Sequence, residues 1–314
     1  MLLWLTGYRI TSCGAGWQPA RRLVTAAARG LFRHAHGAKI ASVVRNAFLK
    51  LGVACLFLLG IARPAPAQAP KIQVLIITGQ NGHDWRATTP VLRKMLEDTK
   101  RFEVRVIEEF RGGGPETLAP YDLVVLNYYD GNKPALRWGA RADNALLDYV
   151  RGGKGLVVYH FSTAAFNGWS EFEQICAGNW RPNNGHHSAR HDFTVTITDS
   201  DHPITRGMRA TFPQANDELY ANLKWQPEGS YHVIATAYDD HALYKPGEKQ
   251  PIPGAGLNQP MLWTTRFGNG RVFTTALGHD PDAMKLSGFV ATFVRGAEWA
   301  ATGAVTLPLP EELK

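Results

Sequence analysis

The stretch Lys71-Ile-Gln-Val-Leu-Ile-Ile-Thr78, followed by Gly79, decides the fold of this chain. It is an almost uninterrupted apolar run, which is typical of a parallel strand that helices cover on both faces. Residues 103–108, 122–127 and 155–159 predict three further strands. Strands that alternate with helices at this rhythm predict right-handed βαβ units and a doubly wound α/β sheet.

Helices are expected between and after these strands. Thr89 and Pro90 predict the N-cap and the first residue of one helix. Residues 142–150 predict a second helix that ends at Gly152-Gly153. A last helix around residues 289–299 should pack back on the sheet.

The second half of the chain is mixed. Residues 193–198 alternate between apolar and polar side chains, as a half-exposed strand does. Residues 231–237 and 261–266 predict further strands, and Asn269-Gly270 marks a hairpin turn that leads to a strand over 272–276. Antiparallel strands are therefore expected beside the parallel ones.

The charge of the chain is unevenly distributed. Among its 314 residues, 34 Lys and Arg face 27 Asp and Glu, which gives a formal net charge of +7. Residues 1–69 hold nine of the basic residues and no acidic residue, so the rest carries 25 basic and 27 acidic side chains. A basic surplus can indicate nucleic-acid binding. Here it is confined to the N-terminal segment, and no nucleic-acid partner is expected.

That segment resembles an export signal. Residues 53–62 form a short apolar run after Arg45 and Lys50, and small residues at alternate positions follow up to Ala69. These are the parts of a secretory signal, and the run is shorter than the roughly 20 apolar residues of a spanning helix. We expect cleavage after Ala67 or Ala69; an uncleaved anchor is the competing interpretation.

The predicted organisation is a leader over residues 1–69, an α/β domain over 70–302 and a tail over 303–314. The mature protein is expected to be exported, most simply to a periplasm, without stable membrane insertion. Only Cys176 lies beyond the leader, so no internal disulfide can form in the mature chain.

Three histidines follow three predicted strands. His83 lies in the loop after the first strand, His160 directly follows Tyr159, and His279 follows the strand that ends at Ala276. In open α/β sheets, ligands bind outside the carboxyl ends of the strands. A lone histidine would more often be structural, but three at equivalent positions favour a common site.

Two polar segments offer further groups. Gly185-His-His-Ser-Ala-Arg-His191 is a loop before a strand, and Asp217-Glu-Leu-Tyr220 sets adjacent carboxylates beside an aromatic residue. Imidazoles and carboxylates suit zinc or another divalent transition metal, and they equally suit metal-free acid/base chemistry. The candidate catalytic residues are His83, His160 and Glu218, and the candidate metal ligands are His83, His279, His186 and His187.

Aromatic residues near these motifs favour a sugar as ligand, because amphipathic rings stack on sugar faces. Gly79 and Gly82 lack the GxGxxG spacing, and no GxSxG elbow occurs, so neither a nucleotide cofactor nor an α/β-hydrolase site is expected. The candidate substrate-binding residues are Trp85, Trp180, Asp217, Tyr220 and Ser162.

Five motifs in order resemble the ThuA-like family, named for a trehalose-utilisation protein. They are Gly82-His-Asp84, Gly153-Lys-Gly-Leu-Val-Val158 before His160, Asp201-His-Pro-Ile-Thr205, Asp217-Glu-Leu-Tyr220 and Leu277-Gly-His279. The resemblance covers residues 71–300. It implies a class I glutamine amidotransferase-like fold, a flavodoxin-like three-layer sandwich with a mainly parallel sheet and added antiparallel strands. It also implies a link to carbohydrate metabolism.

By that resemblance, the turn after the fourth strand is where amidotransferases hold their nucleophilic cysteine. Here the turn is Tyr159-His-Phe-Ser162, so a thiolate acyl-enzyme and ordinary glutaminase activity are excluded. The leading hypothesis is an exported enzyme, a hydrolase or a lyase/isomerase, that acts on a glycoside or keto-sugar. The alternative is a non-catalytic carbohydrate-binding or interaction module on the same fold.

Overall fold

The computed structural model describes residues 70–245 and 252–314. The predicted leader, residues 1–69, lies outside the described residues. Within the described part, no helix is both long and apolar enough to cross a bilayer.

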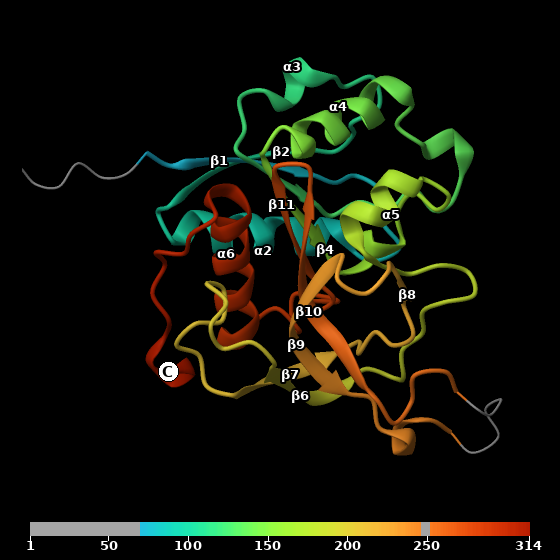
Figure 1. Ribbon diagram of the computed structural model, residues 1–314, viewed down its shortest axis with the longest axis vertical. Coiled ribbons are helices and arrows are strands. Elements are labelled where there is room, and N and C mark those ends of the chain that lie inside the picture. Colours follow the sequence, from blue (N-terminus) through green and yellow to red (C-terminus); the bar gives the residue numbers. More distant parts are fainter. Residues whose placement is uncertain (1–69, 246–251) are drawn as a thin grey trace, which may run out of the picture. The chain divides into compact units, whose positions relative to one another are not determined.

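A nine-stranded mixed sheet forms the centre of the fold, in the order β2-β1-β3-β4-β11-β10-β9-β6-β7 (Figure 1). The first five strands are parallel, and each later neighbour is antiparallel to the one before it. The strands are β1 (Ile72–Ile77), β2 (Phe102–Ile107), β3 (Leu123–Leu126), β4 (Gly155–Tyr159), β6 (His191–Ile197), β7 (Thr211–Asp217), β9 (Tyr231–Tyr238), β10 (Asn258–Phe267) and β11 (Gly270–Thr275). A separate pair joins β5 (Gly178–Asn179) to β8 (Lys224–Trp225).

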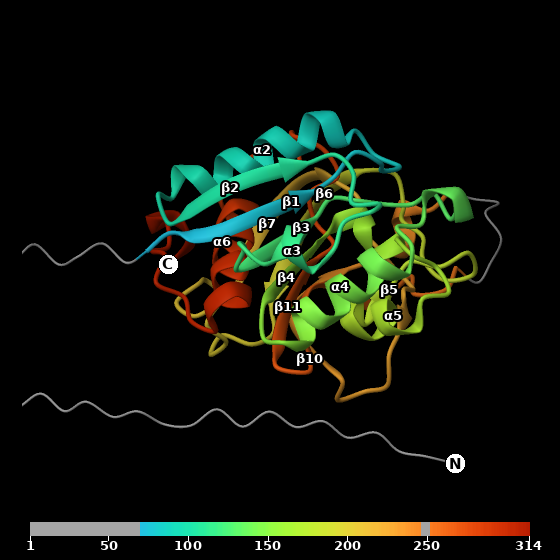
Figure 2. The ribbon, with the colours of Figure 1, turned by 90° about the horizontal axis from the view of Figure 1, so that it is seen from above.

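Helices cover both faces of the parallel half, which confirms the predicted α/β sandwich. Figures 1 and 2 show α2 and α6 on one side of these strands and α3, α4 and α5 on the other. The strand order is that of flavodoxin-like folds, which bind ligands at the strand ends. The helices are α2 (Trp85–Asp98), α3 (Pro115–Leu118), α4 (Ala140–Arg151), α5 (Ser170–Cys176) and α6 (Ser287–Thr302), and the short 3-10 helices are Pro134–Leu136, His160–Ala164, His241–Leu243 and Glu311–Leu313.

The apolar side chains of β1 pack into two hydrophobic cores, one on each face of the sheet. Val74 and Ile76 pack in the core under α2 and α6, whereas Leu75 and Ile77 pack in the core under α4 and α5. Successive side chains of a strand point to opposite faces. A strand buried on both faces therefore has no polar alternation, as the sequence of residues 71–78 predicts.

The antiparallel half contains one strand that the sequence pattern does not predict, β7. Pro213 interrupts it, and the buried residues include the polar Gln214 and Asp217. Proline removes a hydrogen-bond donor and is tolerated on edge strands. Since β7 is the last strand of the sheet, it accommodates Pro213. The strand ends at Asp217, and both Asp217 and the following Glu218 are buried.

The predicted start of the first helix is wrong. Helix α2 begins at Trp85, and the Asp84 side chain accepts a hydrogen bond from the backbone N–H of Ala87, so Asp84 is the N-cap. Thr89 instead turns inward, where its hydroxyl bonds to Asn127. Pro90 lies exposed within the helix. Aspartate is a strong N-cap, and it fixes the helix start five residues before the expected one.

The C-terminal residues 303–314 pack along α6. The Glu298 carboxylate accepts hydrogen bonds from the backbone N–H groups of Thr306 and Leu307. The Arg295 guanidinium donates to the carbonyl of Leu307. Leu313 is buried against the core.

Candidate functional site

Three parallel strands end in loops that carry His83, His160 and His279, after β1, β4 and β11 respectively. Gly278, just before His279, has a φ of 102°, and a Cβ there would lie 2.7 Å from the Phe289 ring. His160 itself has a φ of 45°. Such a backbone conformation is uncommon for a non-glycine residue and clusters at functional sites. These turns aim the three imidazoles toward a common centre.

The Glu218 carboxylate lies beside all three imidazoles. Its Oε2 lies 3.2 Å from His83 Nε2 and 3.5 Å from His160 Nε2. Its Oε1 lies 3.1 Å from His279 Nδ1. The Glu218 side chain is only 8% exposed. A carboxylate from the antiparallel half thus lies among three imidazoles from the parallel half.

Asp217 holds the loops that carry two of these groups. Its Oδ1 accepts the backbone N–H groups of Glu218 and His279, at 2.9 Å each. Its Oδ2 accepts the backbone N–H of Gly278 at 2.7 Å and the Gln214 side-chain amide at 2.8 Å. Asp217 is completely buried. The expectation that it binds substrate does not fit this geometry, because its carboxylate faces the protein backbone.

The tautomer of His160 follows from its surroundings. Its Nδ1 lies 2.6 Å from the carbonyl oxygen of Ala276, which can only accept, so Nδ1 carries the proton. Its Nε2 lies 3.5 Å from Glu218 Oε2 and 2.9 Å from the Tyr220 hydroxyl. A backbone carbonyl that fixes one imidazole nitrogen leaves the other free to bind a metal.

The cluster shifts the pKa values of its members in different directions. Burial alone would raise the pKa of Glu218, but the imidazoles of His160, His279 and His83 outweigh burial and hold it far below its ordinary value. The Glu218 carboxylate raises the pKa of His279. Burial lowers the pKa of His83. Glu218 is therefore ionised, and His83 favours its neutral form.

The two adjacent histidines of the polar loop point apart. His186 forms an isolated β-bridge with Ala221, and neighbouring side chains of an extended segment point to opposite sides. His187 Nε2 lies 3.4 Å from Glu218 Oε1. His186 Nε2 instead lies 3.0 Å from the Tyr244 hydroxyl. The expectation that His186 is a metal ligand therefore does not fit, whereas His187 borders the cluster.

The other predicted substrate-binding residues separate into three places. The Trp180 ring lies 4.9 Å from the Tyr220 ring and 5.9 Å from the His187 ring, so both aromatic residues adjoin the cluster. Ser162 is buried and links Leu126 and Tyr128, which makes it structural rather than substrate-binding. Trp85 lines a cavity that none of the cluster residues lines, between α2 and the ends of β1 and β2.

Several residues that the sequence pattern does not single out position the cluster. The Phe161 ring stacks on the His83 ring at 4.6 Å. The Asn81 side chain accepts the backbone N–H of His83 and donates to Asn127 at the end of β3. Arg190 pairs with Asp280, which ties the loop of His187 to that of His279. The only signal for Asn127 is a polar residue at the end of an apolar strand.

The cluster has the composition and size of a metal site. One donor atom from each of His83, His160, Glu218 and His279 lies within 4.8 Å of every other. His279 Nδ1 is buried and makes no properly directed hydrogen bond, although Glu218 is close. Three imidazoles and one carboxylate are ligands that zinc accepts. An orphaned donor atom aimed at the centre fits an ion there.

One protein-family model matches most of the described part of the chain. The family model for ThuA, described as trehalose utilisation, matches residues 73–300. That range includes every residue of the cluster. No curated protein matches the chain.

The similar solved structures include proteins described as ThuA-like. A ThuA-like protein from Parabacteroides merdae is 31% identical, with a TM-score of 0.67, over 78% of this chain and 95% of that one. A ThuA-like protein from Bacteroides uniformis is 19% identical, with a TM-score of 0.57, over 79% and 98%. The cytoplasmic protein STM3548 from Salmonella typhimurium is 12% identical, with a TM-score of 0.50, over 73% and 98%. The last two likenesses concern the fold alone.

Proposed function

This chain belongs to the ThuA (trehalose utilisation) family, and we propose that it is a carbohydrate-processing enzyme with a divalent transition metal held by its His/Glu cluster. The single observation that carries the proposal is the convergence of His83, His160, His279 and Glu218 from four separate segments of the chain. Zinc accepts imidazole and carboxylate ligands together, as other divalent transition metals do.

The low pKa of Glu218 suits a permanently charged ligand better than a general acid or base. A general acid or base works best when its pKa lies near the working pH. The pKa of Glu218 is far below that range, so this carboxylate suits a permanent negative charge. A bound zinc would polarise a substrate oxygen and lower the pKa of a bound water.

The residues around the cluster supply proton transfer and orientation. His187 is 35% exposed and lies 3.4 Å from Glu218 Oε1, so it can exchange protons with solvent beside the site. The Tyr220 hydroxyl is positioned to donate a hydrogen bond at His160 Nε2 or to a group bound there. His160 is held rigidly by the Ala276 carbonyl. We assign His187 the role of acid/base and Tyr220 that of an orienting donor.

The proposed substrate is a glycoside or a keto-sugar. Trp180 and Tyr220 form an aromatic wall beside His187, and such rings stack on sugar faces. The reaction class is hydrolysis of the glycoside or carbon-acid chemistry of the keto-sugar. Glutaminase chemistry is excluded, because His160 occupies the turn after β4 and Cys176 is buried in α5.

We also propose that the protein is exported to a periplasm. The support is the basic, acid-free segment 1–69 with its apolar run over residues 53–62. N-terminal sequencing of the cellular protein should begin near residue 68 or 70. An intact Met1 on the mature protein would contradict export by cleavage.

The enzymatic proposal is tested by alanine replacement of His160 and of His279, assayed on chromogenic glycosides and on keto-sugars with zinc-loaded protein. Activity should fall at least about 100-fold in both variants. Each variant should retain a cooperative melting transition, which separates loss of chemistry from loss of folding. Turnover that persists in both variants would overturn the site. Saturable sugar binding without turnover in the wild type would favour the non-catalytic binding module instead.

A further inference from the structure

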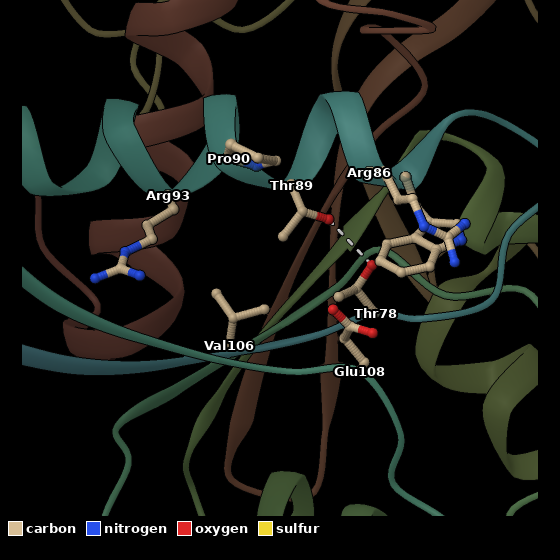
Figure 3. Close-up of a pocket in the computed structure, with 8 residues that line it drawn as sticks. Thr78, Arg86, Thr89, Pro90, Arg93, Val106 and Glu108 are labelled. Atoms are coloured by element: carbon tan, nitrogen blue, oxygen red, sulfur yellow. Dashed lines mark hydrogen bonds between the residues drawn. The ribbon is translucent and has the colours of Figure 1, made fainter.

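A second candidate ligand site is the cavity between α2 and the ends of β1 and β2. Its volume is about 310 Å³, and none of the four residues of the His/Glu cluster lines it. Figure 3 shows the Thr78 and Thr89 side chains joined by a hydrogen bond in its wall, with Glu108 beside Thr78 and Arg86 above it. The volume is at the lower end of the range for small-molecule sites, and it suits a ligand of one or two rings.

In the buried Thr78–Thr89 pair, one hydroxyl hydrogen has no hydrogen-bond acceptor among the described residues. Thr78 is 0% and Thr89 is 5% exposed, and their Oγ1 atoms are 3.0 Å apart, so one hydroxyl donates to the other. Thr89 Oγ1 also accepts from the Asn127 side-chain amide. Whichever hydroxyl donates within the pair, the hydrogen of the other has no acceptor among the described residues. Both threonines line the cavity, and Thr89 keeps 5% exposure, so a ligand oxygen there can accept the Thr89 hydrogen when Thr78 donates within the pair.

The rim of the cavity offers a free donor and a free acceptor. The Arg86 guanidinium lies 4.0 Å above the Trp85 ring and makes no hydrogen bond or ion pair within residues 70–245 and 252–314. The Glu108 carboxylate is likewise free of side-chain partners in that part of the chain. Stacking on the indole holds the guanidinium in place while its N–H groups stay available.

We propose that this cavity binds one sugar unit at a site separate from the His/Glu cluster. Each sugar hydroxyl both donates and accepts, which matches a carboxylate, a guanidinium and a buried hydroxyl donor in one cavity. Val106 and Pro90 add apolar surface for the carbon–hydrogen faces of the ring. Trp85 thus remains a sugar-binding residue, but in a different place from the one where catalysis is proposed.

A neutral polyol fits better than an anion. Arg93, the other cation of the cavity, is paired with Glu97 at 3.0 Å, so its charge is already balanced. Glu108 then opposes Arg86 with the opposite charge, and a phosphate or carboxylate ligand would meet both. The balance of charge in the cavity therefore favours hydroxyl groups over an acidic ligand.

The test is saturation-transfer NMR on the full-length chain with D-glucose, D-galactose and trehalose, and with inorganic phosphate as the anionic probe. We expect saturable binding of at least one sugar with a millimolar dissociation constant, as is usual for a ligand of this size. Glu108→Gln and Arg86→Gln should each weaken binding about tenfold. Glu103→Gln, on the edge strand β2 that precedes Glu108, is the matched control and should bind as the wild type does.

Two further variants distinguish this site from the proposed catalytic one. His160→Ala and Glu218→Gln should keep the sugar binding at the second cavity, even where they abolish turnover. Sugar binding that is lost in these variants but unchanged in Glu108→Gln and Arg86→Gln would overturn the second site and leave the proposed function intact. Absence of binding by every sugar, or binding of phosphate in place of the sugars, would overturn it as well.

Discussion

Asp217 accepts the backbone N–H of His279 at 2.9 Å and, with the same oxygen, the backbone N–H of Glu218. One buried carboxylate thereby sets the positions of a candidate metal ligand from each half of the sheet. Asp217→Asn should disturb both, because an amide group cannot accept at the position where its NH₂ faces the backbone donors. We expect a loss of about 2–4 kcal/mol of unfolding free energy together with weaker zinc binding.

Denaturant unfolding and zinc titration of Asp217→Asn measure the two effects. Asp201→Asn, at an exposed aspartate, is the control and should change neither. If Asp217→Asn bound zinc as the wild type does, then Asp217 would not position the cluster.

The neighbouring histidines His186 and His187 provide a matched pair. His187→Ala removes the imidazole 3.4 Å from Glu218 and should lower kcat about 10- to 100-fold. His186→Ala removes a hydrogen bond to Tyr244 and should cost about 1 kcal/mol of stability with kcat nearly unchanged. Steady-state kinetics on both variants would contradict the assignment if the larger loss of kcat fell on His186→Ala.

The burial of His202 predicts that the fold is sensitive to acid. Burial lowers the pKa of His202 to about 4, and its Nδ1 accepts the backbone N–H of Ile204, which requires the neutral ring. The unfolded chain takes up a proton near pH 6.5, so this residue's contribution to stability is present above that pH. It is lost as the pH falls from about 6.5 toward 4.

His202→Asn keeps an acceptor for Ile204 but removes the titration. Between pH 7.5 and pH 4.5, the unfolding free energy of the wild type should fall by about 2 kcal/mol more than that of the variant. Urea unfolding at the two pH values measures the difference. Parallel losses in both proteins would show that His202 does not govern this sensitivity.

Gly79 is required where the chain leaves β1. It has a φ of 104°, and a Cβ there would lie 1.6 Å from the carbonyl oxygen of Glu108. Gly79→Ala should therefore cost more than about 3 kcal/mol. Gly112→Ala tests φ alone, because Gly112 has a φ of 76° with no atom within 4 Å of such a Cβ, and it should cost about 1 kcal/mol. Equal melting temperatures for the two variants would contradict this account.

Much of the parallel half is predictable from sequence, and the physical reason is local. A strand buried on both faces must be apolar throughout, so β1, β3 and β4 are legible in residues 71–78, 122–127 and 155–159. The placement of His83, His160 and His279 after strand ends follows from the same pattern. Parallel strands have their carboxyl ends at one edge, which brings such residues close.

The other features of the candidate site depend on contacts between segments that are far apart in the sequence. The choice between His186 and His187 is set by a β-bridge to Ala221, 35 positions along the chain. The burial of Asp217 depends on its contacts with the loop of Gly278 and His279. The sequence around Asp217 does not predict this burial. Trp85 follows His83 by two residues, yet helix α2 begins there and carries its side chain into another cavity.

The central claim is that His83, His160, His279 and Glu218 hold one metal ion, and zinc stoichiometry measures it most directly. Full-length protein is loaded with zinc, passed through gel filtration and analysed by inductively coupled plasma mass spectrometry. We predict about one zinc ion per chain for the wild type and for His232→Ala, at an exposed histidine, and less than about a tenth of that for His160→Ala and His279→Ala. A wild-type chain without zinc, or zinc fully retained in His160→Ala and His279→Ala, would contradict the account.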